Sequence, residues 1–181
     1  VYSHIRVADR PDDLHSQRLG RGEADLLLAF DVVAALTAET ASTYARGRTR
    51  AVANEAVSAT QSFQFDRDAV PNREDLLGDL RARLGDEHVT STDVTSLALG
   101  VVGDTIASNL MMVGMALQMG RLPVAAGSLE KAIILNGVAV KMNLTALRLG
   151  RLFIADPDRV RRLMPRAGSD PGLPRTLDEI V

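Results

Sequence analysis

The fold is decided by the stretch Ala24-Asp25-Leu26-Leu27-Leu28-Ala29-Phe30. This apolar run is too short for an independent helix, and it suits a strand that is covered on both faces. Strands of this kind lie inside parallel sheets, because helices pack on both sides of them. We therefore expect a central parallel strand here and an α/β fold built around it.

The residues that follow this run predict a helix and a second strand. Asp31 can cap a helix that extends to about Tyr44, and Arg46-Gly47-Arg48 would end it. Thr49 to Asn54 then returns as another short strand. The order strand, helix, strand is that of a parallel unit with a right-handed crossover.

Two more strands and one helix complete the predicted α/β part. Val1 to Val7 is rich in β-branched and aromatic residues, which favours a strand. Arg73 to Leu84 has leucines at helical spacing, with Asn72 as its cap and Gly85 as its stop. Val89 to Thr92 is the last predicted strand. These elements predict a layered, Rossmann-like sheet with flanking helices.

Polar segments separate these elements. Asp9 to Gly22 contains Pro11 and predicts a loop. Val57 to Asn72 mixes polar and aromatic residues, and we interpret it as a surface excursion with one edge strand around Phe63 to Phe65.

The second half of the chain predicts helices. They cover Asp93 to Leu99, Thr105 to Met119, Ser128 to about Leu135 and Val138 to Arg151. The helix from Thr105 is apolar nearly all round, so it must be buried on more than one side. Its four methionines suit a core and an adaptable docking surface equally well, and in the second case the helix would join copies into a homo-oligomer. We expect one domain over residues 1–154 and a proline- and arginine-rich linker over residues 155–181.

The composition is that of an ordinary soluble domain. The chain has 181 residues, 46% hydrophobic and 24% charged, with a net charge of -2. It gives no indication of a nucleic-acid partner. The nearly uncharged stretch from Val94 to Gln118 is interrupted by Gly100, Gly103 and Asp104, so we expect no membrane span. The chain has no cysteine, which fits a cytoplasmic setting and excludes thiolate ligation of an iron–sulfur cluster by this chain.

No motif for autonomous catalysis is present. The histidines His4, His15 and His88 are scattered without metal-ligand spacing, and no phosphate loop or nucleophile elbow occurs. We therefore expect no metal and no catalytic residue in this chain. Ser3 and His4 are adjacent, but neighbours on a strand face opposite sides of a sheet. We expect one of them to contact a cofactor pocket of a neighbouring domain; the alternative is that Ser3 packs and His4 binds local backbone.

Several stretches together resemble one family. Val1-Tyr2-Ser3-His4-Ile5-Arg6-Val7 and Gly22-Glu23-Ala24-Asp25-Leu26-Leu27-Leu28 are similar to gamma-type domains of 2-oxoacid:ferredoxin oxidoreductases. Three others are similar to the fused indolepyruvate ferredoxin oxidoreductases: Gly103 to Leu110, Ile134 to Leu144 and Thr176 to Val181. The likeness extends from the first residue nearly to the last.

The resemblance implies oxidative decarboxylation of an indolepyruvate-like 2-oxoacid to an acyl-coenzyme A, with electrons passed to ferredoxin. Thiamine diphosphate, coenzyme A and iron–sulfur clusters would belong to other domains of the enzyme. Gamma-type domains begin with a glycine-rich strand–turn–helix unit, and this sequence starts after it without an initiating methionine. We therefore expect a fragment of a larger polypeptide that is inactive alone and acts as an accessory domain, packing against the catalytic domains through the helix Thr105 to Met119. A stand-alone anion-binding module and a purely structural oligomerisation domain are the alternatives.

Overall fold

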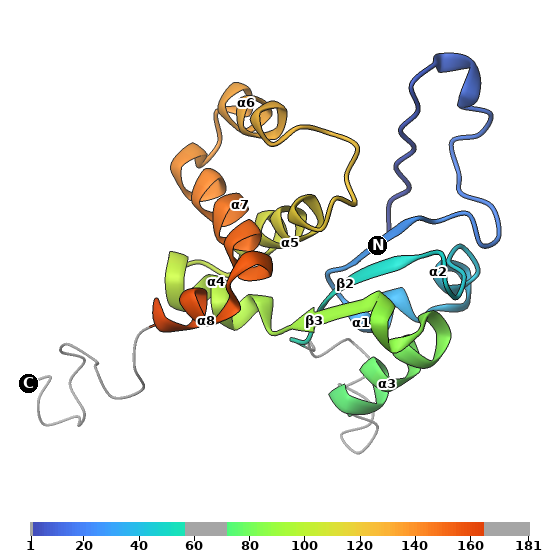
Figure 1. Cartoon of the computed structure of the whole chain (residues 1–181), viewed down its shortest axis with the longest axis horizontal. Coiled ribbons are helices and arrows are strands. Elements are labelled where there is room, and N and C mark those ends of the chain that lie inside the picture. Colours follow the sequence, from blue (N-terminus) through green and yellow to red (C-terminus); the bar gives the residue numbers. More distant parts are fainter. Residues whose placement is uncertain (1, 57–71, 165–181) are drawn as a thin grey trace, which may run out of the picture.

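The computed structural model describes residues 2–56 and 72–164, which form one three-stranded sheet flanked by helices (Figure 1). The strands are β1 (Leu26–Ala29), β2 (Arg50–Asn54) and β3 (Val89–Thr92). The longer helices are α3 (Arg73–Leu84), α4 (Val94–Val102), α5 (Ala107–Gln118), α6 (Ala126–Asn136) and α7 (Val140–Ala155). Shorter helices are η1 (Pro11–Asp13), α1 (Val32–Ala35), α2 (Ala38–Ala41), η3 (Asp86–His88) and α8 (Pro157–Arg162).

The sheet is parallel throughout and has the order β1-β2-β3. Leu26 pairs with Arg50, and Ala51 pairs with Val89. The predicted α/β class with a layered parallel sheet and flanking helices is confirmed. The expectation of a central strand at Leu26–Ala29 is wrong for the described sheet, in which β2 is central and β1 lies at an edge. Arg73–Leu84 and Val89–Thr92 have the predicted bounds, because their caps and stops are encoded locally.

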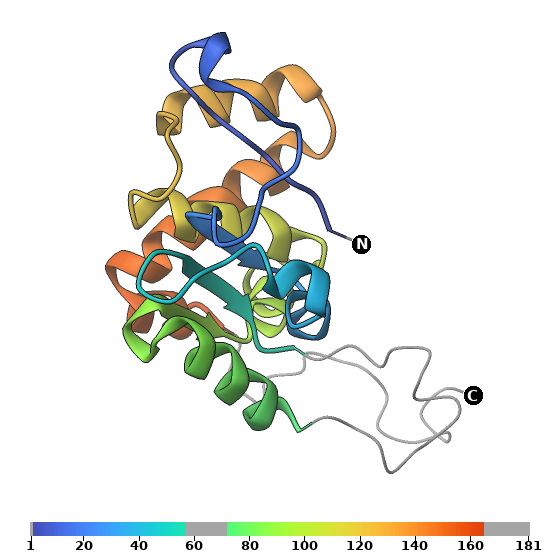
Figure 2. The ribbon, with the colours of Figure 1, turned by 90° about the vertical axis from the view of Figure 1, so that its right-hand side faces the viewer.

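Two cores lie on opposite faces of the sheet. Alternate residues of β2 point into them: Ala51 and Ala53 toward one, Val52 toward the other. The first core is closed by α1 and α3, with Leu80 and Leu84 fully buried. The second is closed by α4, α5, α7 and α8. The helical half therefore covers one face of the sheet, as the turned view shows (Figure 2).

The methionines of α5 lie in the second core. Met111, Met112 and Met115 are fully buried, so of the two roles left open by the sequence the core role is confirmed for these three. They are not available to a partner. Any association through this helix would have to use exposed residues at its ends and outer side, such as Ile106 and Asn109.

Two glycines let α5 and α7 touch backbone to backbone. A Cβ at Gly114 would overlap the Leu147 carbonyl oxygen, and one at Gly150 would overlap the Met111 carbonyl oxygen. The missing side chains thus set the distance between the two helices.

The helix predicted from Asp31 to Tyr44 is two short helices instead. The Asp31 carboxylate caps α1 through the Val33 and Ala34 amides, as expected. The chain is then extended at Thr37, with a ψ of 147°, and its hydroxyl donates to the Ala34 carbonyl oxygen. This side-chain bond offers the backbone an alternative to a continuous helix, which explains the break.

The predicted strand Val1 to Val7 is wrong for the described residues. Tyr2 to Val7 runs outside the sheet in the N-terminal arm, which we define as residues 2–19 (Figure 1). A strand needs a partner for its backbone groups, and this segment pairs with none of the described strands. The predicted edge strand at Phe63 to Phe65 lies outside the described residues.

The first residues of the predicted linker form α8. Asp156 caps this helix through the Arg159 amide, and Val160 is fully buried in the second core. The Arg161 guanidinium lies 5.6 Å from the centre of the Phe153 ring. Helix packing therefore continues at least to Arg162, and the boundary after residue 154 stays a prediction.

No single described helix is long and apolar enough to cross a membrane. Helices α4 and α5 reach that length only as a pair, and a bend of 112° separates them. Both contribute to the second core.

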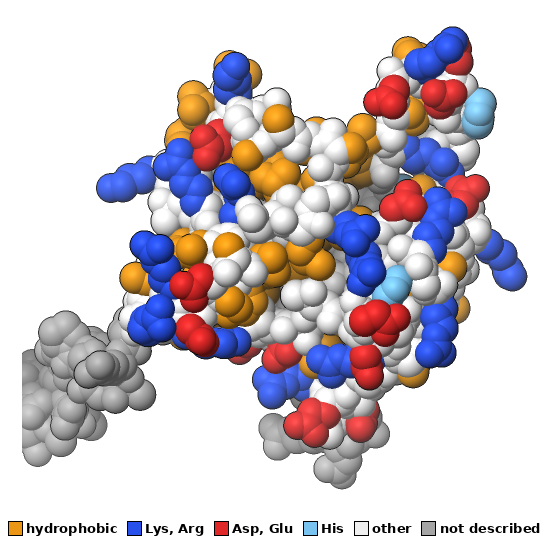
Figure 3. Space-filling view, in the orientation of Figure 1, with side chains coloured by type: hydrophobic (Ala, Val, Ile, Leu, Met, Phe, Trp, Pro, Cys, Tyr) orange, Lys and Arg blue, Asp and Glu red, His pale blue; other side chains and the backbone are white. Residues whose placement is uncertain are grey.

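Charge is divided unevenly between the two halves. Over residues 94–164 there are eight basic and four acidic side chains, whereas acidic residues outnumber basic ones in residues 2–56 and 72–93. Basic groups gather over the helical side in the space-filling view (Figure 3). Helix α6 stands out from this side and buries no residue of its own.

Candidate functional site

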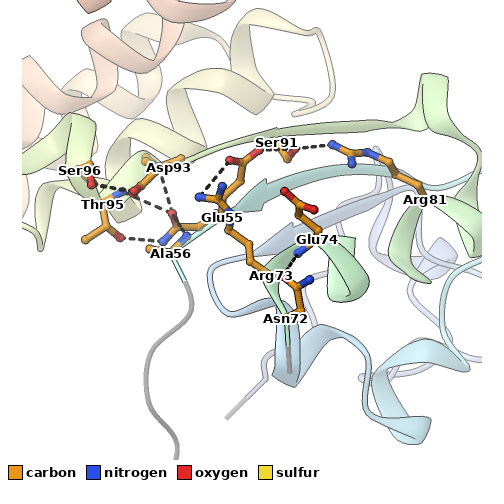
Figure 4. Close-up of polar contacts among 12 residues, drawn as sticks. Glu55, Ala56, Asn72, Arg73, Glu74, Arg81, Ser91, Asp93, Thr95 and Ser96 are labelled. Carbon is orange, nitrogen blue, oxygen red and sulfur yellow. Dashed lines mark hydrogen bonds and ion pairs between the residues drawn. The ribbon is translucent and has the colours of Figure 1, made fainter. Parts of the chain in front are cut away.

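Polar side chains gather where the parallel strands end. Ligands of open α/β sheets bind outside the carboxyl ends of the strands, so this edge is the place to look for a site. Asn54 is the last residue of β2 and is followed by Glu55. Ser91 is the last residue but one of β3, two residues before Asp93. We call Asn54, Glu55, Arg81, Ser91 and Thr95 the strand-end network (Figure 4).

Asn54 connects three elements at this edge. Its Oδ1 accepts hydrogen bonds from the Val94 amide at 3.0 Å and the Thr95 amide at 3.4 Å, at the start of α4. Its Nδ2 donates to the Thr95 hydroxyl at 2.8 Å and to the Phe30 carbonyl oxygen at 3.5 Å. Asn54 is buried, so both ends of its amide are satisfied inside the protein.

A second chain of contacts runs from α3 to the end of β2. The Arg81 guanidinium donates to Ser91 Oγ at 2.9 Å, and the Ser91 hydroxyl donates to Glu55 Oε1 at 2.8 Å (Figure 4). The other oxygen of Glu55 lies 4.0 Å from Nη1 of Arg73. The opposite charges of Arg81 and Glu55, at the two ends of this chain of hydrogen bonds, hold α3, β2 and β3 in place relative to one another.

The two aspartates at this edge are engaged as helix caps. Asp31 accepts from the first turn of α1, and Asp93 accepts from the Ser96 amide at 2.8 Å and the Ser96 hydroxyl at 2.7 Å. A carboxylate therefore already occupies the amides at these two helix starts, and Asp104 likewise accepts from the Ile106 amide at 2.9 Å, just before α5. This arrangement disfavours the stand-alone anion-binding module.

The strand-end network holds no serine–histidine pair. Ser91 contacts an arginine and a glutamate but no histidine that could accept its proton. His88 lies at the other end of β3, where its Nδ1 is 3.1 Å from the Thr49 carbonyl oxygen. Within residues 2–56 and 72–164, no three His, Cys, Asp or Glu side chains lie close enough to hold a metal ion. The hydrogen bonds of the network hold α3, α4, β2 and β3 in place.

The structure places Ser3 and His4 in the N-terminal arm, not at a strand end. Nδ1 of His4 accepts a hydrogen bond from the Leu19 amide at 3.0 Å, and the ring lies 5.4 Å from that of Tyr2. Ser3 is exposed. An open hollow of about 460 Å³ is lined by His4, Arg6, Leu14, His15, Ser16 and Gln17. His4 thus binds local backbone, and its contact with a cofactor pocket stays a prediction.

Side-chain contacts anchor the arm beside the start of β1. Arg6 pairs with Glu23 and donates to the Arg18 carbonyl oxygen at 2.8 Å, and the Tyr2 hydroxyl donates to Glu39. The hydrogen bond to Glu39 raises the pKa of the exposed Tyr2 hydroxyl above its ordinary value. Because Glu23 precedes β1, the arm and the strand-end network belong to opposite ends of the strands, and the structure does not bring Ser3 and His4 to that network.

Sequence reasoning missed the residues of the strand-end network. The available signal was position: Asn54 and Glu55 end one predicted strand, and Ser91 lies near the end of another. Arg81 gave no signal, because its role depends on how α3 packs against β3.

One comparison with known proteins identifies a family. Residues 1–153 match the family described as pyruvate ferredoxin/flavodoxin oxidoreductase. No curated protein and no solved structure matches the chain. The match covers far more than half of the sequence and nearly all of the described elements, so the chain belongs to the pyruvate ferredoxin/flavodoxin oxidoreductase family.

Proposed function

We propose that this chain is an accessory domain of a 2-oxoacid:ferredoxin oxidoreductase, which supports the reaction by packing against the catalytic domains. One observation carries the proposal: in a domain of an oxidoreductase family, the polar strand-end groups are bonded to one another, and Ser91 has no histidine partner among the described residues. Such a domain contributes surface and position, while the chemistry belongs to other parts of the enzyme.

The cofactors expected for the whole enzyme do not fit this chain. The sequence has no cysteine, so it cannot ligate an iron–sulfur cluster through thiolates. No three His, Cys, Asp or Glu side chains of the described residues lie close enough together to hold a metal ion. We assign thiamine diphosphate, coenzyme A and the clusters to other domains or subunits, with ferredoxin as the electron acceptor and the cytoplasm as the setting.

The turn between α6 and α7 is the surface that best fits a catalytic domain. Leu135 is 86% exposed and Val138 is 64% exposed, on either side of Gly137. Both lie in the stretch Ile134 to Leu144, which is similar to the fused indolepyruvate enzymes. Core packing does not account for these apolar residues, and docking does. We therefore propose an indolepyruvate-type 2-oxoacid as the substrate of the whole enzyme.

Reconstitution tests the accessory role. The chain is mixed with the remaining domains of the enzyme, and 2-oxoacid-dependent dye reduction is measured with indolepyruvate and with pyruvate. We expect the chain to restore the activity, with indolepyruvate preferred. The double variant Leu135→Asp/Val138→Asp should restore at least tenfold less. The matched control Leu163→Asp, at an exposed leucine of the last described turn, should behave as the wild type.

Two results would contradict the proposal. Dye reduction that is the same with and without the chain would remove the accessory role. A loss of activity shared by the double variant and Leu163→Asp would show that the α6–α7 turn is not the docking surface.

A kinetic variant tests the predicted contact of His4 with a cofactor pocket. In the reconstituted enzyme, His4→Ala should change the KM for coenzyme A or for the 2-oxoacid. His15→Ala is the control, because His15 is an exposed histidine of the same arm. Equal kinetics for both variants would limit His4 to its bond with the Leu19 amide.

A further inference from the structure

Both lysines of the chain lie beside the turn between α6 and α7. The sequence has 21 basic side chains, and only Lys131 and Lys141 among them are lysines. Lys131 lies four residues before Leu135, on the same face of α6. Lys141 lies in the first turn of α7, three residues after Val138. Both lysines are exposed, so their ammonium groups can reach a partner that binds at this turn.

The positive charge of this face is not balanced within the chain. From Lys131 to Ala155 the sequence holds four basic residues and no acidic one. Glu130, just before this stretch, is already paired with Arg148 at 3.0 Å. Neither lysine forms an ion pair with a described residue. The two ammonium groups are therefore open to carboxylates from outside the described chain.

Lys141 occupies a position that the chemistry of a helix start disfavours. The free amides of a first turn carry partial positive charge, so acidic side chains are favoured there and lysine is not. The first turn of α7 has no acidic residue and no side-chain cap. Ala139, just before this turn, has a φ of 44°, in the left-handed region that favours glycine. Both features lower stability, and features of this kind gather where a protein binds a partner.

We propose that the α6–α7 turn binds an acidic surface of the catalytic domain, whose carboxylates lie against Lys131 and Lys141. This inference rests on the proposed function and gives the partner surface its chemistry. The exposed side chains of Ile134, Leu135 and Val138 form the apolar centre of the contact, and the two lysines form its charged rim. The flexible stem of each lysine lets its ammonium group follow a carboxylate on the partner.

The residues of this face favour a protein partner over a nucleic acid or a membrane. Single-stranded nucleic acids stack their bases on aromatic side chains, but the only aromatic residue between Lys131 and Ala155 is Phe153, which is buried. Anionic membranes are recognised by clusters of about four to eight basic residues. Two lysines around an aliphatic centre match the charged rim and apolar centre of a protein–protein contact.

Carbodiimide cross-linking of the reconstituted enzyme tests the acidic surface directly. The reagent joins an amine to a carboxylate in contact with it, and Lys131 and Lys141 carry the only side-chain amines of the chain. We expect amide links from these lysines to aspartate or glutamate residues of the catalytic domain, located by mass spectrometry. The double variant Lys131→Arg/Lys141→Arg keeps the charge, so it should bind as the wild type does and lose these links.

Binding of the chain to the remaining domains of the enzyme, measured by calorimetry, tests the charge itself. Lys131→Glu/Lys141→Glu should weaken the complex at least tenfold. The control Arg159→Glu/Arg162→Glu makes the same change of charge at exposed residues of α8, and its affinity should stay within about threefold of the wild type.

The outcomes separate this inference from the proposed function. Suppose the wild type binds and restores dye reduction. The acidic surface would then be overturned by the absence of lysine–carboxylate links or by full affinity of the lysine-to-glutamate variant, and the accessory role would stand. A wild-type chain that does not bind the remaining domains would overturn both. Binding to anionic vesicles or single-stranded DNA that only the lysine-to-glutamate variant loses, with its affinity for the enzyme unchanged, would assign the lysines to that other partner.

Discussion

At the scale of single residues, Asn54 makes hydrogen bonds that would otherwise need several capping side chains. It accepts from two amides of α4 and donates toward β1, so one amide side chain joins the ends of two strands to the start of a helix. A buried amide of this kind is hard to replace, because each lost bond leaves a buried partner unsatisfied.

Asn54→Ala should therefore destabilise the protein. The variant leaves the Val94 amide without its acceptor, and one such unsatisfied buried group costs about 1–3 kcal/mol. Urea unfolding followed by circular dichroism measures the change. Asn109→Ala is the control, because Asn109 is exposed on α5, and it should change the unfolding free energy by less than about 0.5 kcal/mol. Equal effects of the two variants would contradict the role of Asn54.

Glu23 makes the anchoring of the arm sensitive to acid. The Gly20 amide, and next the Arg6 guanidinium, hold the pKa of this exposed carboxyl below its ordinary value. The folded pKa is depressed, so the anchoring is fully present above the unfolded pKa of about 4.3 and is lost as the pH falls through the lower folded pKa. We expect the Gly20 amide, which donates to the Glu23 carboxylate at 2.7 Å, to lose protection in that range.

An NMR titration from pH 6 to pH 2 measures this loss. Glu23→Gln should abolish the acid transition of the Gly20 amide. Glu130→Gln is the matched control, because Arg148 also lowers the pKa of Glu130 but the pair lies on α6 and α7. A transition that persists in Glu23→Gln would assign the titration to another group.

Residue-level expectations from the sequence succeeded where the partner is a few residues away. Asp31 and Asn72 cap their helices as predicted, because a cap bonds to amides two or three positions ahead. The strand-end network was out of reach, since Ser91 meets Glu55 only when β2 and β3 pair.

At the scale of elements, the sequence predicted strands and helices whose ends carry their own signals. β1, β2 and β3 follow from short strand-like runs, and α3 follows from its cap and its glycine stop. The strand Val1 to Val7 failed for the opposite reason: strand composition does not supply a neighbouring strand. The break at Thr37 depends on one side-chain bond that periodicity does not show.

The contact between α5 and α7 should be intolerant of a single methyl group. Gly114→Ala and Gly150→Ala each place a Cβ against a facing carbonyl oxygen, and we expect each to destabilise the protein by about 1–3 kcal/mol or more. Gly127→Ala is the control, because its Cβ would meet nothing within 4 Å in α6. Alanine loses less backbone entropy on folding than glycine does, so that variant should be more stable by about 0.5–1 kcal/mol. Thermal unfolding of the three variants measures the difference, and a neutral Gly150→Ala would mean that the helices are farther apart.

At the scale of the whole molecule, the two cores share the strands β1 and β2. β2 sends Val52 into one core and Ala51 and Ala53 into the other, so neither core can form without it. The sequence predicted the layers but not this division, because facing helices are assigned to a core only by tertiary packing.

The shared strands predict a single cooperative unfolding transition. Leu80→Ala truncates the first core and Met115→Ala the second, and each should cost about 2–5 kcal/mol. In native-state hydrogen exchange, each variant should lower the protection of the slowest amides in both α3 and α5 by the same free energy. Protection lost on one face alone would show two independent units.

The uneven charge of the two halves makes the molecule an electric dipole. Its positive end is the helical half that follows Asp93, and its negative end is the part that carries the sheet and the arm. This field orients a charged partner before the surfaces of the two proteins come into contact, so encounters begin from a preferred direction. Ionic strength then acts on the rate of association far more than on the lifetime of the complex.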